Sequence, residues 1–569
     1  MTISIDKKIK IKIKPGETVL QAAKRNGIEI PALCYHPDLK IKANCRLCLV
    51  EIEGEKGLFP SCAIKAKEGM KIKTDSPKIR KARSINLGLI FNQQPELLAF
   101  AKRHKIKIAK FSPRKKDYSK DSFGPAITFD RGKCINCRNC LEACQKQEVS
   151  FYEILQKYTF NEVSLTRDIK KDCVYCGQCV VHCPVGALLA KNDIEKVKKS
   201  LADKNKITIA QFAPSIRTSI GEEFNLPYGR VVTDKLASAI RKLGFDLVFD
   251  TSVGADFTTF EEAEELMEKL EKKKTPCLSS CCPAWVKFIE FYYPEFVSSI
   301  ATTRSPQVIL GGLIKTYFAK KQKIDPKKIV VVSIMPCVAK KYEIERKELR
   351  IKKDIKPVDF VLTTRELAQM LKERKINLKK IKAQKADNPL AAPSGSGIIY
   401  GASGGVMEAV LRTVYYKATK KKLPRVIFKK VRGEEGIKKA VIKIKGKEIR
   451  IAVASPLDNA KKILDELKKN PEAYHGVEIM ACPGGCIGGG GQPLPNNSKI
   501  RKKRAESLYL IDEKKKIKSA HENPVLKKVY QDFLTTKEKR HSLCHTFYSP
   551  KKREVYPAKK SRTLPRDKK

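Results

Sequence analysis

The sequence predicts a multidomain protein of mixed α/β and α+β fold, and three observations lead to this prediction. The chain has 569 residues, more than a single hydrophobic core usually organises. Its 19 cysteines occur in separate groups with different spacing. From about residue 205, apolar strands alternate with helices rich in Lys and Glu, as in ITIAQFAPSIR followed by VTDKLASAIRKLGF. This alternation is typical of an α/β domain with a mostly parallel sheet.

Composition limits the compartment and the partners. The first residues show no secretory pattern, so the cysteines favour metal ligation over disulfides. No apolar run reaches the ~18 residues that cross a bilayer. We therefore expect a soluble cytoplasmic protein with no membrane insertion. The net charge of +55 often indicates nucleic acid or anionic membrane binding, but Lys is spread over every segment and no nucleic-acid motif occurs. A Lys-rich proteome and a surface that docks an acidic electron carrier are the two alternatives.

The N-terminal domain, predicted over residues 1–75, joins an alternating strand to a cysteine-bearing loop. MTISIDKKIKIKIKPG alternates apolar residues with Lys, as a strand with one solvated face does. Cys34, Cys45, Cys48 and Cys62 follow the spacing C-x10-C-x2-C-x13-C. A zinc knuckle is the alternative, although zinc sites usually show two close pairs. The motif resembles the 2Fe–2S module of modular hydrogenases and of the large iron–sulfur subunit of respiratory complex I, which implies a β-grasp ferredoxin fold.

Residues 76–125, predicted as a linker, contain no cysteine. Many proteins with this N-terminal module hold a further 4Fe–4S cluster here through one His and three Cys. Gln94 stands where the His ligand is expected, and His104 has no Cys partner nearby. We therefore expect the cluster to be absent, His104 to lie on the surface, and residues 112–125 to be a linker.

The third predicted domain, residues 126–197, carries two runs of C-x2-C-x2-C-x3-C. This is the bacterial two-cluster ferredoxin pattern, in which the fourth Cys of each run ligates the other cluster. His182, beside the last Cys, is expected to be exposed. Two 4Fe–4S clusters are therefore predicted, with the ligand sets Cys134, Cys137, Cys140 and Cys183 for one and Cys173, Cys176, Cys179 and Cys144 for the other.

The domain predicted over residues 205–500 holds four cysteines in the segments SSCCPAW, MPCVAKKYE and EIMACPGGCIGGGGQP. Each segment pairs Cys with Pro or Gly, which lets the backbone approach inorganic sulfur closely. Four thiolates from distant parts of a chain are what a cubane requires. Together the segments resemble the signature of iron-only (FeFe) hydrogenases. The resemblance implies an H-cluster, a cubane bridged to a two-iron subsite with carbon monoxide, cyanide and a dithiolate, held by Cys282, Cys337, Cys482 and the bridging Cys486.

The same resemblance implies a set of residues around the two-iron subsite, which itself has almost no protein ligands. Lys340 would hydrogen-bond one cyanide, and FAPS would line the other. Tyr400 replaces a frequent Phe, with little expected effect. GASGGV alone would suggest a phosphate loop, but it lacks the Lys-Ser/Thr ending. The residues implied to contact the subsite, besides Lys340, are Ala213, Pro214, Ser215, Gln307, Met335 and Met480.

A proton route is implied as well. In the family, the Cys that precedes the first ligand relays protons, and here it is Cys281; a buried spare Cys is otherwise a small apolar filler. Glu262 and Glu265, in FEEAEELMEK, are implied as relay carboxylates, and their spacing puts them on one helix face. The alternative is a solvated acidic face. Relatives place a Ser where this chain has Ala301, so Thr302 or a water would supply the hydroxyl.

The predicted function is reversible reduction of protons to hydrogen, with electrons delivered through the iron–sulfur clusters. The expected partners are an acidic ferredoxin, or flavin- or nicotinamide-binding subunits, and the enzymes that mature the H-cluster. A hydrogen sensor and a non-catalytic iron–sulfur assembly relative are the alternatives. Residues 501–550 are predicted to resemble the hydrogenase small subunit, and residues 551–569 to be a basic tail. Cys277 and Cys544 match no ligand position. The segment HSLCH only weakly indicates a metal site.

Overall fold

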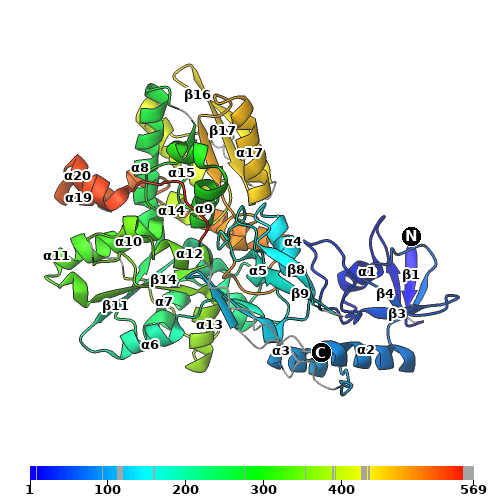
Figure 1. The fold of residues 1–569 in the computed structure, drawn as a ribbon. Coiled ribbons are helices and arrows are strands. Elements are labelled where there is room, and N and C mark those ends of the chain that lie inside the picture. Colours follow the sequence, from blue (N-terminus) through cyan, green and yellow to red (C-terminus); the bar gives the residue numbers. More distant parts are fainter. Residues whose placement is uncertain are drawn as a thin grey trace, which may run out of the picture.

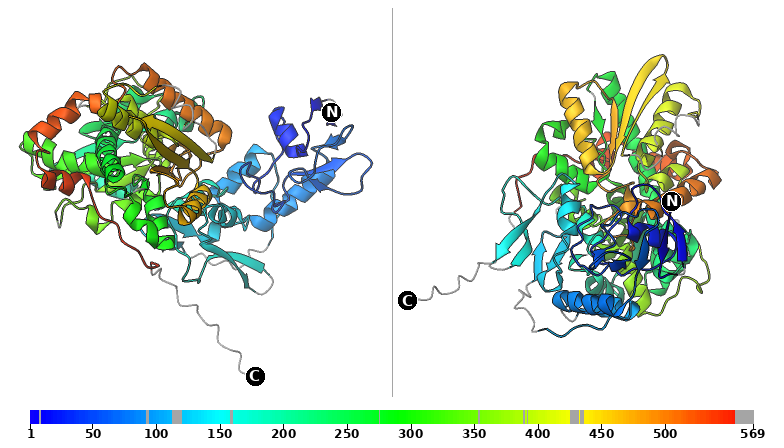
Figure 2. Two further views of the ribbon diagram at one scale, coloured as in Figure 1. Left: turned by 90° about the horizontal axis from the view of Figure 1, so that it is seen from above. Right: turned by 90° about the vertical axis from the view of Figure 1, so that its right-hand side faces the viewer.

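The computed structural model describes residues 1–7, 9–91, 94–111, 120–157, 160–274, 276–352, 354–387, 390, 392–424, 432 and 436–554. Residues 555–569 of the predicted tail and residues 112–119 of the predicted linker lie outside these ranges. Three units follow one another in space, with the N-terminal unit projecting from one end and the cysteine-rich unit between it and a large body (Figures 1 and 2). No helix in the described part is long and apolar enough to cross a membrane.

The N-terminal unit is a five-stranded sheet with one helix, as a β-grasp fold requires. The strand order is β2-β1-β5-β3-β4, with β1 antiparallel to β2 and parallel to β5. The segment predicted as one strand is in fact two, because Asp6 and Lys7 adopt positive φ and turn the chain. The elements are β1 (Thr2–Ile5), β2 (Ile9–Lys12), α1 (Val19–Arg25), β3 (Leu49–Ile52), β4 (Phe59–Pro60) and β5 (Lys71–Lys73).

Two helices, α2 (Pro77–Ile90) and α3 (Pro95–Arg103), connect this unit to the next. Arg83 of α2 is buried and donates to the carbonyl of Leu47 at 3.0 Å, which fixes the helix to the cysteine loop. The sequence predicts His104 on the surface, but its side chain is largely covered. Its ring packs on Phe100 with centroids 4.4 Å apart. Its side chain is only 10% exposed.

The middle unit shows the internal repeat that its two cysteine runs predict. Each run leads into a short helix, and each helix follows a residue in the left-handed region, Arg138 before α4 and Gly177 before α5. The end of the predicted linker 112–125 packs with the middle unit, since β6 pairs with β7 and Phe123 is buried. The elements are β6 (Lys120–Phe123), β7 (Ile127–Asp130), α4 (Asn139–Gln145), β8 (Tyr152–Lys157), β9 (Phe160–Leu165), α5 (Gln178–Val181) and β10 (Leu188–Ala190).

The large unit contains two four-stranded sheets. The first is entirely parallel, with order β12-β11-β14-β15, and the second has order β13-β18-β17-β16 with only the β16–β17 pair antiparallel. The apolar segment IVVVSIM forms β14, all of whose residues are buried. The strands are β11 (Ile207–Phe212), β12 (Leu247–Asp250), β13 (Cys277–Leu278), β14 (Ile329–Met335), β15 (Phe360–Thr363), β16 (Ile437–Ile444), β17 (Lys447–Ala454) and β18 (Gly476–Ile479).

Helices cover both sheets, and the long helix α8 (Ser252–Glu271) packs mainly against α10, α14 and α15. Gly254 permits the close approach of α10, because a Cβ there would lie 2.2 Å from the Pro306 carbonyl oxygen. The other helices up to residue 469 are α6 (Ile194–Ala202), α7 (Thr233–Lys242), α9 (Pro283–Tyr292), α10 (Pro306–Leu313), α11 (Ala319–Lys321), α12 (Ala339–Glu343), α13 (Thr364–Glu373), α14 (Gly395–Ile399), α15 (Gly405–Thr419) and α17 (Leu457–Lys469).

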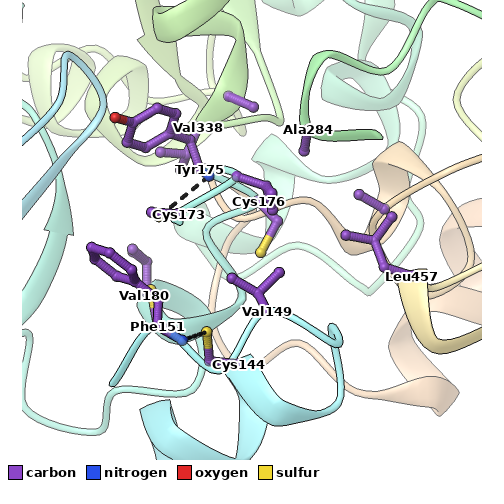
Figure 3. Packing of buried hydrophobic residues seen from close by; sticks show 14 of the residues in the cluster. Cys144, Val149, Phe151, Cys173, Tyr175, Cys176, Val180, Ala284, Val338 and Leu457 are labelled. Atoms are coloured by element: carbon purple, nitrogen blue, oxygen red, sulfur yellow. Dashed lines mark hydrogen bonds between the residues drawn. The ribbon is translucent and has the colours of Figure 1, made fainter. Parts of the chain in front are cut away.

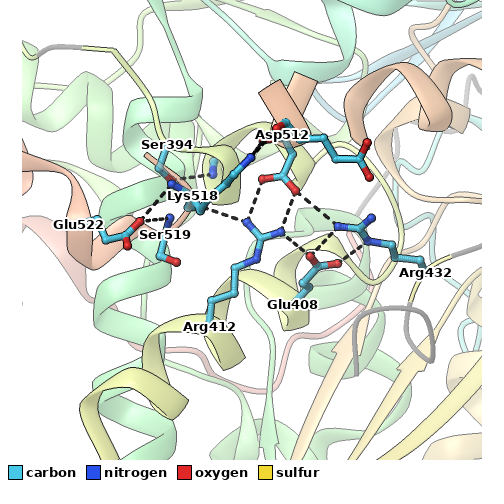
Figure 4. A network of polar contacts seen from close by, with 10 residues as sticks. Ser394, Glu408, Arg412, Arg432, Asp512, Lys518, Ser519 and Glu522 are labelled. Atoms are coloured by element: carbon cyan, nitrogen blue, oxygen red, sulfur yellow. Dashed lines mark hydrogen bonds and ion pairs between the residues drawn. The ribbon is translucent and has the colours of Figure 1, made fainter. Parts of the chain in front are cut away.

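The C-terminal segment wraps around the large unit as α18 (Ser498–Lys514), α19 (Pro524–Asp532) and α20 (Lys537–Cys544) (Figure 1). A buried ion network fastens α18 to α15 (Figure 4). In it, Arg412 contacts Asp512 at 2.7 Å and also Glu408, and Arg432 contacts Glu408 at 2.8 Å. Two guanidinium groups therefore offset two buried carboxylates, which would otherwise be costly to bury.

Candidate active site

The predicted H-cluster cysteines meet in one cavity of the large unit. Cys337 follows β14, Cys482 follows β18, Cys282 precedes α9, and Cys486 begins a short 3₁₀ turn. Ligands in open α/β sheets lie beyond the carboxyl ends of strands, and two of these cysteines do. All of the predicted subsite residues line the same cavity, namely Ala213, Pro214, Ser215, Gln307, Met335, Lys340 and Met480, together with Cys281 and Tyr400.

Glycines bring backbone close to this cavity. Gly485 has φ +92°, and a Cβ there would lie 2.6 Å from the Ser403 nitrogen. A Cβ on Gly489 would lie 2.2 Å from the Pro336 carbonyl oxygen. The two glycines therefore let three backbone segments converge around the cysteines, as the small residues of these motifs predict.

The buried cysteine thiols of the cavity are suited to bind iron. Burial, together with the charge of neighbouring Cys282, raises the pKa of Cys337 to about 12. Cys482 and Cys486 are likewise influenced by both of these cysteines, so the four lie close together. Thiols in such surroundings stay protonated unless a metal cation compensates the thiolate charge. Four convergent thiols lining one cavity fit a cubane, which binds four thiolates.

Lys340 is held by a carboxylate that the sequence analysis did not single out. Its Nζ donates to Glu343 at 2.8 Å and to the Cys281 carbonyl at 3.1 Å. Burial lowers the pKa of Lys340, but Glu343 more than offsets it, so the net shift is upward. Gln307 donates to the same carboxylate at 2.5 Å. Glu343 lies three residues after Lys340 in PCVAKKYE, and this i,i+3 spacing was the available signal.

The predicted relay carboxylates lie on α8, and Glu262 is inside the protein. Its side chain is buried, and its Oε2 has no hydrogen-bond partner among the described residues. Burial, followed by the charges of Glu265 and Glu478, raises the pKa of Glu262 to about 8. The solvated-face alternative therefore does not hold for Glu262. Burial and the nearby Glu262 carboxylate also raise the pKa of Cys281.

Glu265 lies one turn further along α8 and faces a loop. Both of its oxygens accept from the Thr302 amide at 2.9 Å, and the Thr302 hydroxyl donates to it at 3.2 Å. Ala301 is fully buried and contributes no proton. The Thr302 hydroxyl contacts Glu265 but makes no hydrogen bond to the Glu262 Oε2. The Thr302 hydroxyl therefore does not bridge Glu265 and the Glu262 Oε2, and a water between the carboxylates stays a prediction.

Glu478 is a second carboxylate that the sequence analysis missed. It is fully buried in β18 and accepts from the amides of Gly404 at 2.7 Å and Met407 at 2.8 Å. Burial raises its pKa. Its charge contributes to raising the pKa values of Cys281 and Glu262, so it lies beside the relay. An acidic residue within the apolar strand VEIMAC was a signal for it.

The two cysteine sets of the middle unit are grouped as the ferredoxin pattern predicts. Cys134, Cys137, Cys140 and Cys183 line one cavity. In the other set, the charges of Cys179 and Cys144 contribute to raising the pKa values of Cys173 and Cys176. Backbone amides donate to the sulfurs, from Phe151 to Cys144 at 3.2 Å and from Tyr175 to Cys173 at 3.4 Å (Figure 3). Such donors are what iron–sulfur clusters use to tune their potential.

The second set adjoins the active-site cavity. The Cys482 Sγ lies 3.9 Å from the Cys176 carbonyl oxygen, and Gln178 donates to the Gly488 carbonyl at 3.1 Å. A Cβ on Gly177 would lie 2.9 Å from the Gly490 Cα. Backbone and sulfur therefore touch directly between the two cysteine groups.

The first set faces the N-terminal unit. Asn44 donates to the Asn136 carbonyl at 2.8 Å, and Gln94, at the expected His position, donates to the Lys133 carbonyl at 3.0 Å. His182 is buried rather than exposed as predicted, because its Nδ1 binds the Gln178 carbonyl at 2.7 Å and its ring packs on His36. The docked N-terminal unit covers it.

The N-terminal cysteines also lie close together. The Cys45 amide donates to the Cys34 sulfur at 3.4 Å. A hydrogen bond from Cys62 lowers the pKa of Cys48 to about 7, and the charges of Cys34 and Cys45 are felt at Cys62. All four are free thiols. This donor set of four convergent thiols fits a 2Fe–2S cluster.

Comparisons with known proteins agree with these units. Family models match for the 2Fe–2S iron–sulfur cluster binding domain at residues 1–77, the 4Fe–4S dicluster domain at 133–187, the C-terminal domain of the iron-only hydrogenase large subunit at 206–490, and the iron hydrogenase small subunit at 498–551. The chain is 39% identical to the NADP-reducing hydrogenase subunit HndD of Solidesulfovibrio fructosivorans, over 97% of this chain and 99% of that one.

Two further relatives cover different shares of the chain. Iron hydrogenase 1 of Clostridium pasteurianum is 36% identical over 91% of this chain and 94% of its own. A solved apo structure of a variant of the [FeFe]-hydrogenase HydA1 of Chlamydomonas reinhardtii superposes with a TM-score of 0.57 and 36% identity, over 63% of this chain and 99% of that one. The chain belongs to the iron-only hydrogenase family, and its domains bind a 2Fe–2S cluster, two 4Fe–4S clusters and an H-cluster.

Proposed function

We propose that this iron–sulfur oxidoreductase converts protons and hydrogen reversibly at the cavity lined by Cys282, Cys337, Cys482 and Cys486. The observation that carries the proposal is the convergence of these cysteines with Cys281 and Lys340 on one cavity. The H-cluster, held by these four cysteines, would supply the electrons that hydrogen chemistry requires. The presence of Cys281 and Lys340 favours an enzyme over an assembly protein.

The protein's own residues would deliver protons. Cys281 lines the cavity and takes up or releases a proton there, and Glu262 behind it exchanges that proton with Glu265 across the space beside Ala301. A carboxyl with a pKa of about 8 is well placed for this task, because it is readily protonated and deprotonated near neutral pH. Lys340 carries the positive charge that would bind an anionic ligand of the subsite.

Electrons would pass from one cysteine set to the next in the order in which these sets are in contact. The N-terminal set docks on the set containing Cys134, and the set containing Cys176 adjoins Cys482. The electron donor would be an acidic ferredoxin or a flavin- or nicotinamide-linked partner subunit. The Solidesulfovibrio fructosivorans relative is named as an NADP-reducing hydrogenase subunit, which supports the second choice. We place the protein in the cytoplasm, with H-cluster maturation enzymes as transient partners.

Dependence on maturation tests this function. A polypeptide cannot make carbon monoxide or cyanide, so expression without the dedicated assembly enzymes should give a protein with cubanes, no infrared bands from those ligands and no hydrogen turnover. Expression with them should give both bands and turnover. Turnover in the absence of the bands would overturn the proposal, as would bands without turnover.

A further inference from the structure

A histidine of the C-terminal segment links two carboxylates of α8. The Thr302 hydroxyl lies 2.9 Å from His545 Nδ1 and 3.2 Å from a Glu265 oxygen. On the other side of the ring, His545 Nε2 lies 3.1 Å from Glu261. Both ring nitrogens are therefore hydrogen-bonded, and one of them reaches Glu265 through a single hydroxyl.

The backbone fixes this imidazole in place. Thr303 and His545 form an antiparallel bridge, and the Thr546 amide donates to the Thr302 carbonyl at 2.8 Å. The Arg304 guanidinium donates to the His545 carbonyl at 2.6 Å. Tyr530 donates to the Glu261 carboxylate that faces Nε2. The ring is hydrogen-bonded at both nitrogens, and its backbone is fixed by Thr303 and Arg304, so it is oriented for transfer, whereas a loosely attached surface histidine is not.

The exposed fraction of the side chains increases from Glu265 through His545 to His541. The Glu265 side chain is 11% exposed and the His545 side chain 15% exposed. His541, one helical turn before His545, is exposed, and the two rings lie nearly parallel with centroids 5.6 Å apart. The residues thus lead from the buried relay to the surface of α20.

We propose that Thr302 and His545 form a branch of the proton route that connects Glu265 to solvent, with Glu261 and Tyr530 as positioning residues. A proton taken up at Nε2 is matched by release of the Nδ1 proton to the Thr302 oxygen, while the hydroxyl passes its own proton to Glu265. One proton enters, one leaves, and no electron moves. Histidine suits this role because its charge ordinarily changes near neutral pH. The branch rests on the proposed function.

Another charged group contacts Glu265. Lys269 lies 3.6 Å from Glu265 on the same helix, and it provides neither the imidazole nor the hydroxyl that the branch needs. The charged and titratable groups that face His545 or its Glu261 partner are Glu265, Lys269, Arg304, Lys417, Tyr530, Arg540, His541 and Cys544.

Substitutions in the mature holoenzyme test the branch. His545→Gln keeps hydrogen-bonding groups but cannot exchange protons, and Thr302→Val removes only the hydroxyl. Each should lower hydrogen evolution about three- to tenfold, below the ~100-fold typical for loss of a sole acid–base group, because Glu265 is itself 11% exposed and can still exchange protons with solvent. Thr302→Ser should restore the rate. The control is His475→Gln, whose ring accepts from the Arg450 amide at 2.9 Å at the edge of the second sheet, and which should retain the wild-type rate.

Readouts other than rate separate transfer from structure. The H-cluster infrared bands should be unchanged in all variants, and added imidazole should partly rescue His545→Gly. Wild-type rates in His545→Gln and Thr302→Val would overturn the branch, as would a loss that neither Ser nor imidazole restores. An inactive wild-type protein with intact bands would instead overturn the proposed function.

Discussion

The electron side and the proton side of the active-site cavity are built from different groups. On the electron side, Cys176 and Gly177 touch Cys482 and Gly490 through backbone and sulfur. On the proton side, carboxylates and a hydroxyl follow one another along α8 and the loop after Ala301. Electrons need close packing between clusters, whereas protons need an exchangeable hydrogen at every step. A single substitution should therefore interrupt the proton side more readily than the electron side.

The sharpest test compares two adjacent cysteines. Cys282→Ala removes a predicted cluster ligand and should lose the H-cluster and its infrared bands. Cys281→Ala should keep the bands but lose turnover by ~100-fold or more, as removal of a positioned acid–base group does. Infrared spectroscopy and hydrogen evolution on the same samples check both. Near-normal turnover in Cys281→Ala would show that this thiol only fills space and is not the first step of the proton route.

Glu262→Gln should have the next largest effect. The amide keeps the shape but cannot pass a proton, so hydrogen evolution should fall sharply while the cluster spectra stay intact. Wild-type turnover in this variant would show that α8 is not the proton path. Glu265→Gln, assayed in parallel, should also slow turnover, which separates the path from a local effect at Glu262.

The same substitution has a consequence for stability. Burial, Glu265 and Glu478 raise the pKa of Glu262 from its ordinary value of 4.5 to about 8. Between these values the folded protein holds a proton that the unfolded chain has released, so this group's contribution to stability falls as pH rises and is lost above about pH 8. Glu262→Gln should therefore unfold at a higher temperature than wild type at pH 9, with a smaller difference at pH 5. An equal difference at both pH values would contradict the raised pKa.

The cysteine sets of the electron side lead us to expect a defined iron content and no change of it on Gln94→His. Fully matured protein should contain about sixteen irons, the total for one 2Fe–2S cluster, two cubanes and the H-cluster. Gln94→His should leave this number unchanged, because no Cys lies between Cys62 and Cys134 to complete a further cluster. Iron analysis and electron paramagnetic resonance check both. About twenty irons, or a spectrum of a His-ligated cubane, would show an additional cluster in this region.

The two sides also differ in how far the sequence predicted them. Cysteine spacing alone grouped Cys134 with Cys183, because ligand spacing is set by cluster chemistry. Burial of His182 was mispredicted, since it depends on how the N-terminal and middle units pack. Glu343 and Glu478 had local signals that were overlooked. His545 could not be placed from the sequence, because it lies 243 residues from its partner Thr302 and only the wrapped C-terminal segment brings them together.

Ala301→Ser should produce the smallest change. It tests what connects Glu262 and Glu265, since Ala301 offers no exchangeable proton between them. Ala301 is fully buried and lies before the loop residue whose hydroxyl binds Glu265. A Ser here would add a hydroxyl where related hydrogenases are expected to have one, between Glu262 and Glu265. If a water already fills this role, activity should stay level; if the water is poorly held, activity should rise. The rate and solvent isotope effect of hydrogen evolution measure this. A marked fall would mean that the hydroxyl displaces a water that the relay requires, and that the two carboxylates communicate only through it.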